Sequence, residues 1–282
     1  MRKFKIFIVI IGVLLLLVGG GLLAVSIVKA DSNKEELKSI TTEVKESFTD
    51  LSVNVDQANV EIKKSTDSVC KVEAQETEKL HYVIEVKSGK LTITDNDTRD
   101  WYEKYFFNFR FFNVKVIVYI PFDEFNNINI KSSTGSVIIH DSFKYNTASI
   151  ESSTGRIEFY NAIVAGDIKL KSSTGSISVN NVKSANLEAN SSTGEIGLKN
   201  YIASNSFKLE TSTGGISFEE CDAKSIIVKS HTGGVHGILL TPKKFSCTSA
   251  TGGINVPNSD DTADGTCVIS TSTGGIHVSI AA

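Results

Sequence analysis

Histidine and cysteine are the side chains of this chain that could bind a metal ion, and their spacing does not favour that chemistry. The sequence contains His81, His140, His231, His236, His277, Cys70, Cys221, Cys247 and Cys267. These residues show no zinc-ligand spacing. His236 and His277 occupy equivalent positions of a repeated unit. With the units stacked in sequence order they lie two units apart, too far for one metal ion. We therefore predict no metal site and no cofactor.

Catalytic motifs are also missing from the sequence. There is no Gly-x-Ser-x-Gly elbow, no P-loop and no His-Glu-x-x-His pattern. The insertion at 258–264 contains Asp260, Asp261 and Asp264. It lacks the spacing of an EF-hand and of calcium-binding solenoid repeats, so a solvated loop is the favoured interpretation. We predict that the protein is not an enzyme and has no catalytic residues.

The feature that organises the chain is a Thr-Gly pair that recurs eight times, with successive glycines 19 to 22 residues apart. A fixed period of about 20 residues is typical of a solenoid, in which each repeat is one coil. The predicted corner residues are Thr134, Gly135, Thr154, Gly155, Thr174, Gly175, Thr193, Gly194, Thr213, Gly214, Thr232, Gly233, Thr251, Gly252, Thr273 and Gly274.

Apolar residues on both sides of each corner have the spacing of β-strands. Ile168 and Leu170 precede Gly175, and Ile177 and Val179 follow it. Residues two apart in a strand point to one face, and glycine turns the chain through positive φ without a Cβ clash. A third apolar position, as at Val182, Tyr201 and Cys221, suggests a third short strand or a buried loop residue. The pattern predicts an all-β, single-stranded parallel β-helix (a β-solenoid).

Hydroxyl side chains should also stack between coils. The threonines of the corners form one column, and serines such as Ser132, Ser152, Ser172 and Ser191 form another. We favour a structural interpretation, in which these hydroxyls bond to backbone groups of the corners. The alternative is a flat outward array that orders water. Cys247 and Cys267 occupy strand positions that are apolar in other coils, which favours core packing.

The N-terminus predicts a membrane anchor. An uncharged apolar run spans residues 6–28, long enough to cross a bilayer. Arg2, Lys3 and Lys5 precede it and only Lys29 directly follows, so we expect a cytoplasmic N-terminus and an extracellular remainder. Cleavage as a signal peptide is the alternative, although the run exceeds the usual length. The anchor with its basic tip occupies residues 1–30.

The exported part is acidic and has three predicted regions. Its 25 basic residues against 32 acidic ones give a net charge of −7, which argues against nucleic-acid partners. Residues 31–47, with Leu37, Ile40 and Val44 at helical spacing, predict a polar stalk or short helix. The β-solenoid spans 48–282, divided into irregular N-terminal coils with an aromatic cap (48–125) and eight regular coils (126–282).

One aromatic segment stands apart from the repeats. Eight of the residues from 101 to 112 are aromatic, and they include the only Trp. Burial as a cap over the first coils is one interpretation, and an exposed partner-binding surface is the other. The candidate partner-binding residues are Trp101, Tyr102, Tyr105, Phe106, Phe107, Phe109, Phe111 and Phe112.

The Thr-Gly repeats and the strand Val114–Ile120, closed by Pro121, resemble the bacterial putative-adhesin family, a domain of unknown function built of β-strand repeats. The resemblance covers about residues 48–282. It implies a right-handed β-helix with no established catalytic residues. Similar proteins of Gram-positive bacteria have one N-terminal membrane helix, and some lie near cell-envelope stress systems.

These observations lead to one leading hypothesis and two alternatives. The leading one is a membrane-anchored extracellular module that binds a surface polymer or protein, or acts as a scaffold, without catalysis. The first alternative is an accessory regulator of envelope-stress signalling that acts through membrane partners. The weaker alternative is a β-helix enzyme that cleaves glycans. An open edge at the final coil also predicts end-to-end self-association.

Overall fold

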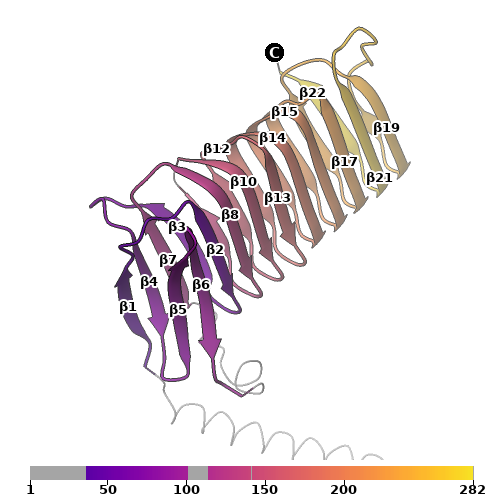
Figure 1. Cartoon of the computed structure of the whole chain (residues 1–282). Helices are drawn as coiled ribbons and strands as arrows, with labels where there is room; N and C mark the ends of the chain where they lie inside the picture. Colours follow the sequence, from indigo (N-terminus) through magenta and orange to yellow (C-terminus); the bar gives the residue numbers. More distant parts are fainter. Residues whose placement is uncertain (1–35, 101–113, 141, 282) are drawn as a thin grey trace, which may run out of the picture.

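The computed structural model describes residues 36–100, 114–140 and 142–281. Every helix-or-strand element in these residues is a β-strand, so the predicted all-β class is confirmed. The strands form an elongated stack of coils (Figure 1). The predicted membrane segment, 6–28, lies outside the described residues. Within them, no helix has the length and apolar character needed to cross a membrane.

The described residues form 22 strands. The first nine are β1 (Lys38–Glu43), β2 (Asp50–Val55), β3 (Asn59–Lys64), β4 (Lys71–Glu76), β5 (Leu80–Lys87), β6 (Lys90–Asp97), β7 (Lys115–Ile120), β8 (Glu124–Ser132) and β9 (Val137–Ile139). The next seven are β10 (Phe143–Ser152), β11 (Ile157–Tyr160), β12 (Ala162–Val164), β13 (Asp167–Ser172), β14 (Ile177–Thr193), β15 (Ile196–Thr213) and β16 (Ile216–Cys221). The last six are β17 (Ser225–Thr232), β18 (Val235–Leu239), β19 (Lys244–Thr251), β20 (Ile254–Asn255), β21 (Thr266–Thr273) and β22 (Ile276–Ile280).

The regular coils stack in parallel and in register. One face of the stack contains β2, β8, β10, β13, the C-terminal parts of β14 and β15, and then β17, β21 and β19 (Figure 1). The second face contains β3, β9, β11, the N-terminal parts of β14 and β15, and then β16, β18, β22 and β20. Ile130 pairs with Ile150, and Ile150 with Leu170, so equivalent apolar residues form columns.

The core fills the space between the two faces. Ile168, Leu170, Ile177 and Val179 are each 1% exposed, as the strand spacing predicts. Val182 pairs with Tyr201 in the adjacent coil, and both are fully buried. The third apolar position therefore belongs to a third short strand, since β14 and β15 continue through it. Stacking joins apolar faces that no single coil can bury into one core.

The N-terminal end corrects the prediction of a purely parallel helix. β2 pairs with β8, although residues 56–123 separate them in sequence. The intervening chain forms an outer layer with β4 and β5 and returns through β6 and β7, beside β2 and β3. β4 pairs antiparallel with β1 and β7, and β5 pairs antiparallel with β6. The strands are therefore a mixed system, closed at this end by antiparallel pairs.

The segment before the first coil is also different from the prediction. Residues 36–47 lie within the predicted stalk or short helix, and they contain strand β1 instead. Leu37 and Ile40 are exposed, whereas Val44 is buried in the core. Three apolar residues at spacings of three and four are too few to distinguish a helix from an edge strand.

The C-terminal coils are stacked out of sequence order, which the repeat pattern did not predict. β21 lies between β17 and β19, and β22 lies between β18 and β20. The free end of the stack is therefore the coil of β19 and β20, where Phe245 and Cys247 are half-buried and Ile254 is 45% exposed. The predicted open edge is wrong in its position, since the last coil lies inside the stack. Self-association stays a prediction.

Candidate binding surface

The Ser-Ser-Thr-Gly corners are held together by buried hydroxyl groups. Ser172 Oγ accepts a bond of 2.8 Å from Gly175 N–H and donates one of 3.4 Å to the Gly155 carbonyl oxygen in the adjacent coil. Eight residues donate in the same way to a backbone carbonyl of the neighbouring coil; they are Ser132, Ser152, Ser172, Ser191, Thr211, Ser230, Thr271 and Ser249. This buried hydroxyl column has the predicted structural role, and its members point inward.

The corner glycines are required mainly by close contact between coils. A Cβ at Gly175 would lie 2.0 Å from the Gly155 carbonyl oxygen, closer than any real Cβ contact. Only the last four corner glycines combine such a contact with positive φ, as at Gly214 with φ of 154°. The repeated Thr-Gly pattern predicts positive φ at all eight. That reason is wrong for the first four, where the short distance to the previous coil excludes a side chain.

A different corner uses left-handed backbone. Asn161, Asn181 and Asn200 have φ between 48° and 55° and occupy equivalent positions of successive coils. Asn181 Nδ2 donates to Asn161 Oδ1 at 2.8 Å. Asparagine tolerates this conformation better than most residues. The sequence signal for this corner is an Asn at about 20-residue intervals. The corner was not predicted, because the repeat was defined by the Thr-Gly pairs alone.

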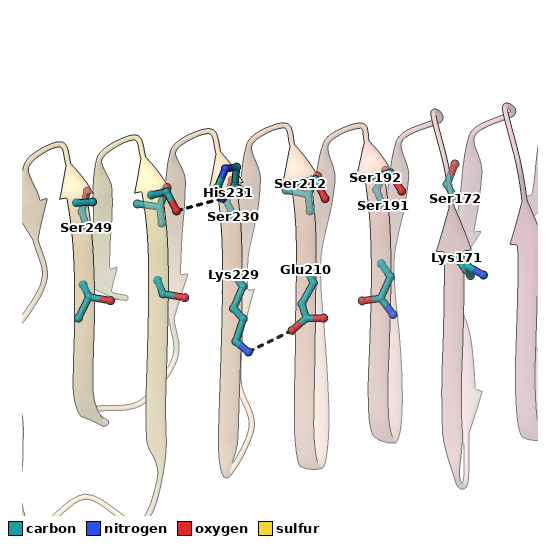
Figure 2. A pocket seen from close by; sticks show the side chains of 17 residues that line it. Lys171, Ser172, Ser191, Ser192, Glu210, Ser212, Lys229, Ser230, His231 and Ser249 are labelled. Carbon is teal, nitrogen blue, oxygen red and sulfur yellow. Dashed lines mark hydrogen bonds and ion pairs between the residues drawn. The ribbon is translucent and has the colours of Figure 1, made fainter.

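A polar groove runs along the outer surface beside the Thr-Gly corners. It has a volume of about 760 Å³ and crosses β13, β14, β15, β17, β21 and β19 (Figure 2). Eleven of its 17 lining residues are Ser or Thr, and six of these belong to the inward hydroxyl column. The side chains that define this surface, called here the corner groove, are half-buried Glu210 and the exposed Lys171, Ser192, Ser212, Lys229 and His231.

The charged residues of the corner groove form pairs across neighbouring strands. Lys229 Nζ lies 3.5 Å from Glu210 Oε1 (Figure 2), and Lys171 Nζ lies 3.3 Å from Glu151 Oε1. Lys131 continues the same row toward β8, with its Nζ 3.8 Å from Glu151 Oε2. Exposed pairs of this kind contribute little to stability. The charges alternate at intervals of one strand, about 4.8 Å, from Lys131 through Glu151 to Lys171, and Asn190 separates Lys171 from Glu210 in the groove.

A second, smaller pocket lies where the chain crosses between the exchanged C-terminal coils. Its volume is about 460 Å³. Lys243, which is 5% exposed, places Nζ 2.6 Å from Asp222 Oδ1 and 2.6 Å from Thr241 Oγ1. In the adjoining loop, Asp260 Oδ1 accepts bonds from the N–H and hydroxyl of Thr262, which lower the pKa of the Asp260 carboxyl. These contacts hold the crossing loop in place.

The structure tests the predicted corner residues but does not test the predicted aromatic segment. The Thr-Gly pairs do line up along one edge of the stack, and their threonines are exposed except for half-buried Thr134. The candidate partner-binding segment, 101–112, lies outside the described residues and stays a prediction. The Lys-Glu row of the groove is not among the residues predicted from the sequence. Its signal was charge at one position of successive repeats, at Lys131, Glu151 and Lys171.

The cysteines behave as core residues. Burial raises the pKa of the Cys221 and Cys267 thiols to about 12. All four cysteines are free thiols. Among the described residues, no group of three or more His, Cys, Asp or Glu side chains is arranged to hold a metal ion.

Two solved structures have a similar fold. A protein of Bacteroides fragilis, described as a putative adhesin, has 17% identity and a TM-score of 0.53, and the match covers 86% of this chain and 97% of that chain. A protein of Parabacteroides distasonis, described as a putative lipid binding protein, has 20% identity and a TM-score of 0.52, with 86% and 97% covered. At these identities the likeness concerns the fold alone. No curated protein matches the sequence.

The family comparison covers almost the whole β-structure. The family described as Toastrack DUF4097 matches residues 48–281, which include every strand from β2 to β22. The resemblance predicted from the Thr-Gly repeats is therefore confirmed: this chain belongs to the Toastrack DUF4097 family.

Proposed function

We propose that this protein is a non-enzymatic binding module displayed at the cell surface, and that the corner groove is its binding site. The observation that supports this is a groove of about 760 Å³ that crosses six adjacent strands and is lined largely by Ser and Thr residues. Repetition at the strand spacing suits an extended ligand, because each successive coil offers similar hydrogen-bonding groups. The ligand we propose is an extended, hydroxyl-rich polymer such as a cell-wall glycan.

The ion pairs of the charged groups in the corner groove support binding rather than catalysis. Glu210, the carboxylate of the groove, lies 3.5 Å from Lys229 and 3.1 Å from Lys208. Both carboxylate oxygens of Glu210 are therefore engaged in ion pairs within the protein. The hydroxyl groups at the bottom of the groove already bond to backbone carbonyls, so they act as fixed structure.

Display at the surface rests on the N-terminal sequence. The apolar run at 6–28 would anchor the chain in the membrane and leave the β-structure outside the cell. The two structures with a similar fold are described as an adhesin and as a lipid-binding protein, so the fold alone does not decide the ligand.

Co-sedimentation of the full-length chain, in detergent, with purified cell walls tests this proposal. We expect saturable pelleting that weakens several-fold in Lys229→Glu. The matched control is Lys199→Glu: both lysines are about half exposed and pair with a glutamate of the neighbouring coil, but Lys199 lies on the opposite face. No pelleting, or equal effects of the two substitutions, would contradict a groove that binds wall polymer. The first result would favour the regulatory alternative.

A further inference from the structure

The exchange of the C-terminal coils brings two histidines together on the outer surface. His236 in β18 is the direct strand partner of His277 in β22, and their ring centroids are 6.4 Å apart. Both side chains are exposed. Stacking of the coils in sequence order predicts that the two histidines lie two coils apart, about 9.6 Å at the usual strand spacing. That separation is wrong, because the coil that should lie between them stacks outside His277.

A third polar side chain contacts this pair. Asn255 in β20 pairs with His277 on the other side, and its amide nitrogen lies 3.1 Å from His277 Nδ1. The two ends of an amide are interchangeable in such a contact. As placed, the amide N–H donates to His277 Nδ1; turning the amide by 180° would instead set Oδ1 against Nδ1–H and leave the free lone pair on Nε2, the arrangement found around metal-bound histidine.

The backbone beside the rings is bare. Glycine follows the corner glycine in the last four coils, at Gly215, Gly234, Gly253 and Gly275. The earlier coils have Ser136, Arg156, Ser176 and Glu195 at this position. A Cβ at Gly234 would lie 3.3 Å from His236 Nε2. The His236 imidazole therefore lies against glycine backbone, where no side chain stands beside it.

We propose that His236 and His277 bind one divalent transition-metal ion of the class that prefers imidazole, such as Zn²⁺ or Cu²⁺, with Asn255 orienting His277. Bonds of about 2.0–2.1 Å from each nitrogen require the two ligand atoms to lie within about 4 Å of each other. Rotation of two exposed side chains achieves this without backbone movement. Water or a partner group completes the coordination.

Isothermal titration of the untagged full-length chain with ZnCl₂ and with CuCl₂ tests the site. We expect one ion per chain, with Cu²⁺ bound more tightly than Zn²⁺. His236→Ala and His277→Ala should each lower the affinity at least tenfold, and the double variant should add little. Asn255→Ala should lower it about tenfold.

The matched control is His140→Ala, which removes another exposed histidine of the same surface, at the far end of the stack. It should leave the titration unchanged. Circular dichroism of each variant checks that the fold is intact. Absence of binding at millimolar metal, or equal affinity in His277→Ala and the unmodified chain, would overturn the proposal. So would a loss in His140→Ala as large as the loss in His277→Ala.

Discussion

The close contact between successive corner glycines predicts that adding a single methyl group at one of them will strongly lower the free energy of unfolding. In Gly175→Ala the new Cβ would lie 2.0 Å from the Gly155 carbonyl oxygen and 2.9 Å from Arg156 N, both of them backbone atoms. Reaching an ordinary contact requires the two corners to separate by more than 1 Å. That movement breaks the Ser172 bond to Gly155 and weakens the 2.9 Å bond from Thr174 N–H to Ser153.

The expected cost follows from these contacts. Overpacking costs about 1–3 kcal/mol, and each lost hydrogen bond about 1 kcal/mol. Gly175→Ala should therefore lower the free energy of unfolding by about 3–5 kcal/mol. Equilibrium urea denaturation followed by far-ultraviolet circular dichroism measures this quantity. Because whole domains are stable by only about 5–15 kcal/mol, the effect is easily resolved.

Gly215→Ala is the matched control for this substitution. A Cβ there meets nothing closer than 3.6 Å, its φ is outside the left-handed region, and Ser176 already occupies the equivalent position of another coil. We expect a change between zero and a stabilisation of about 1 kcal/mol. If Gly175→Ala unfolds within about 1 kcal/mol of Gly215→Ala, the close-contact explanation of the repeated glycine is wrong.

Three further predictions concern the corners and the core. Ser172→Ala leaves Gly175 N–H and the Gly155 carbonyl without their hydroxyl partner and should cost about 1–3 kcal/mol in urea denaturation, whereas exposed Ser173→Ala should stay within about 0.5 kcal/mol. Asn181→Val forces a β-branched residue into φ of 55° and should cost about 1–3 kcal/mol, while Asn181→Gly should cost less; equal costs would refute the conformational argument. Raising the pH above 9 should destabilise the fold, because Cys221 and Cys267 keep their protons up to a pKa of about 12 while unfolded thiols release them near 9. The loss is about 1.4 kcal/mol per thiol per pH unit in urea titrations from pH 8 to 11, and Cys267→Ala should reduce the slope.

The local structure of the coils could be predicted from sequence because each repeat states the same pattern. Ile168 and Leu170 alternate with polar residues, and the period places them beside Ile150 and Ala189 in adjacent coils. The inward Ser172 hydroxyl followed from the need to satisfy buried backbone groups. These are local rules of strand geometry, and they hold in every coil.

The order of the coils could not be predicted in the same way. The patterns around Gly252 and Gly274 are nearly identical, so sequence alone does not say which coil packs against β17. Long-range pairings also determine the structure of the N-terminal end, where β2 pairs with β8 although five strands, β3 to β7, separate them in sequence. The corner groove was missed for a related reason. Outward residues such as Lys171 and Glu210 do not pack in the core, so the apolar pattern does not predict them. They form one surface only because the register of the strands aligns them.

The exchange of the last two coils also constrains how the protein is made. β19 and β20 are synthesised before β21 and β22, yet they occupy the place beyond them. The earlier coils can join the growing stack one at a time as translation proceeds. At the C-terminal end, β21 and β22 occupy the edges of β17 and β18, and the coil of β19 and β20 packs on them. The observed order of these coils can therefore form only after β21 and β22 have been synthesised.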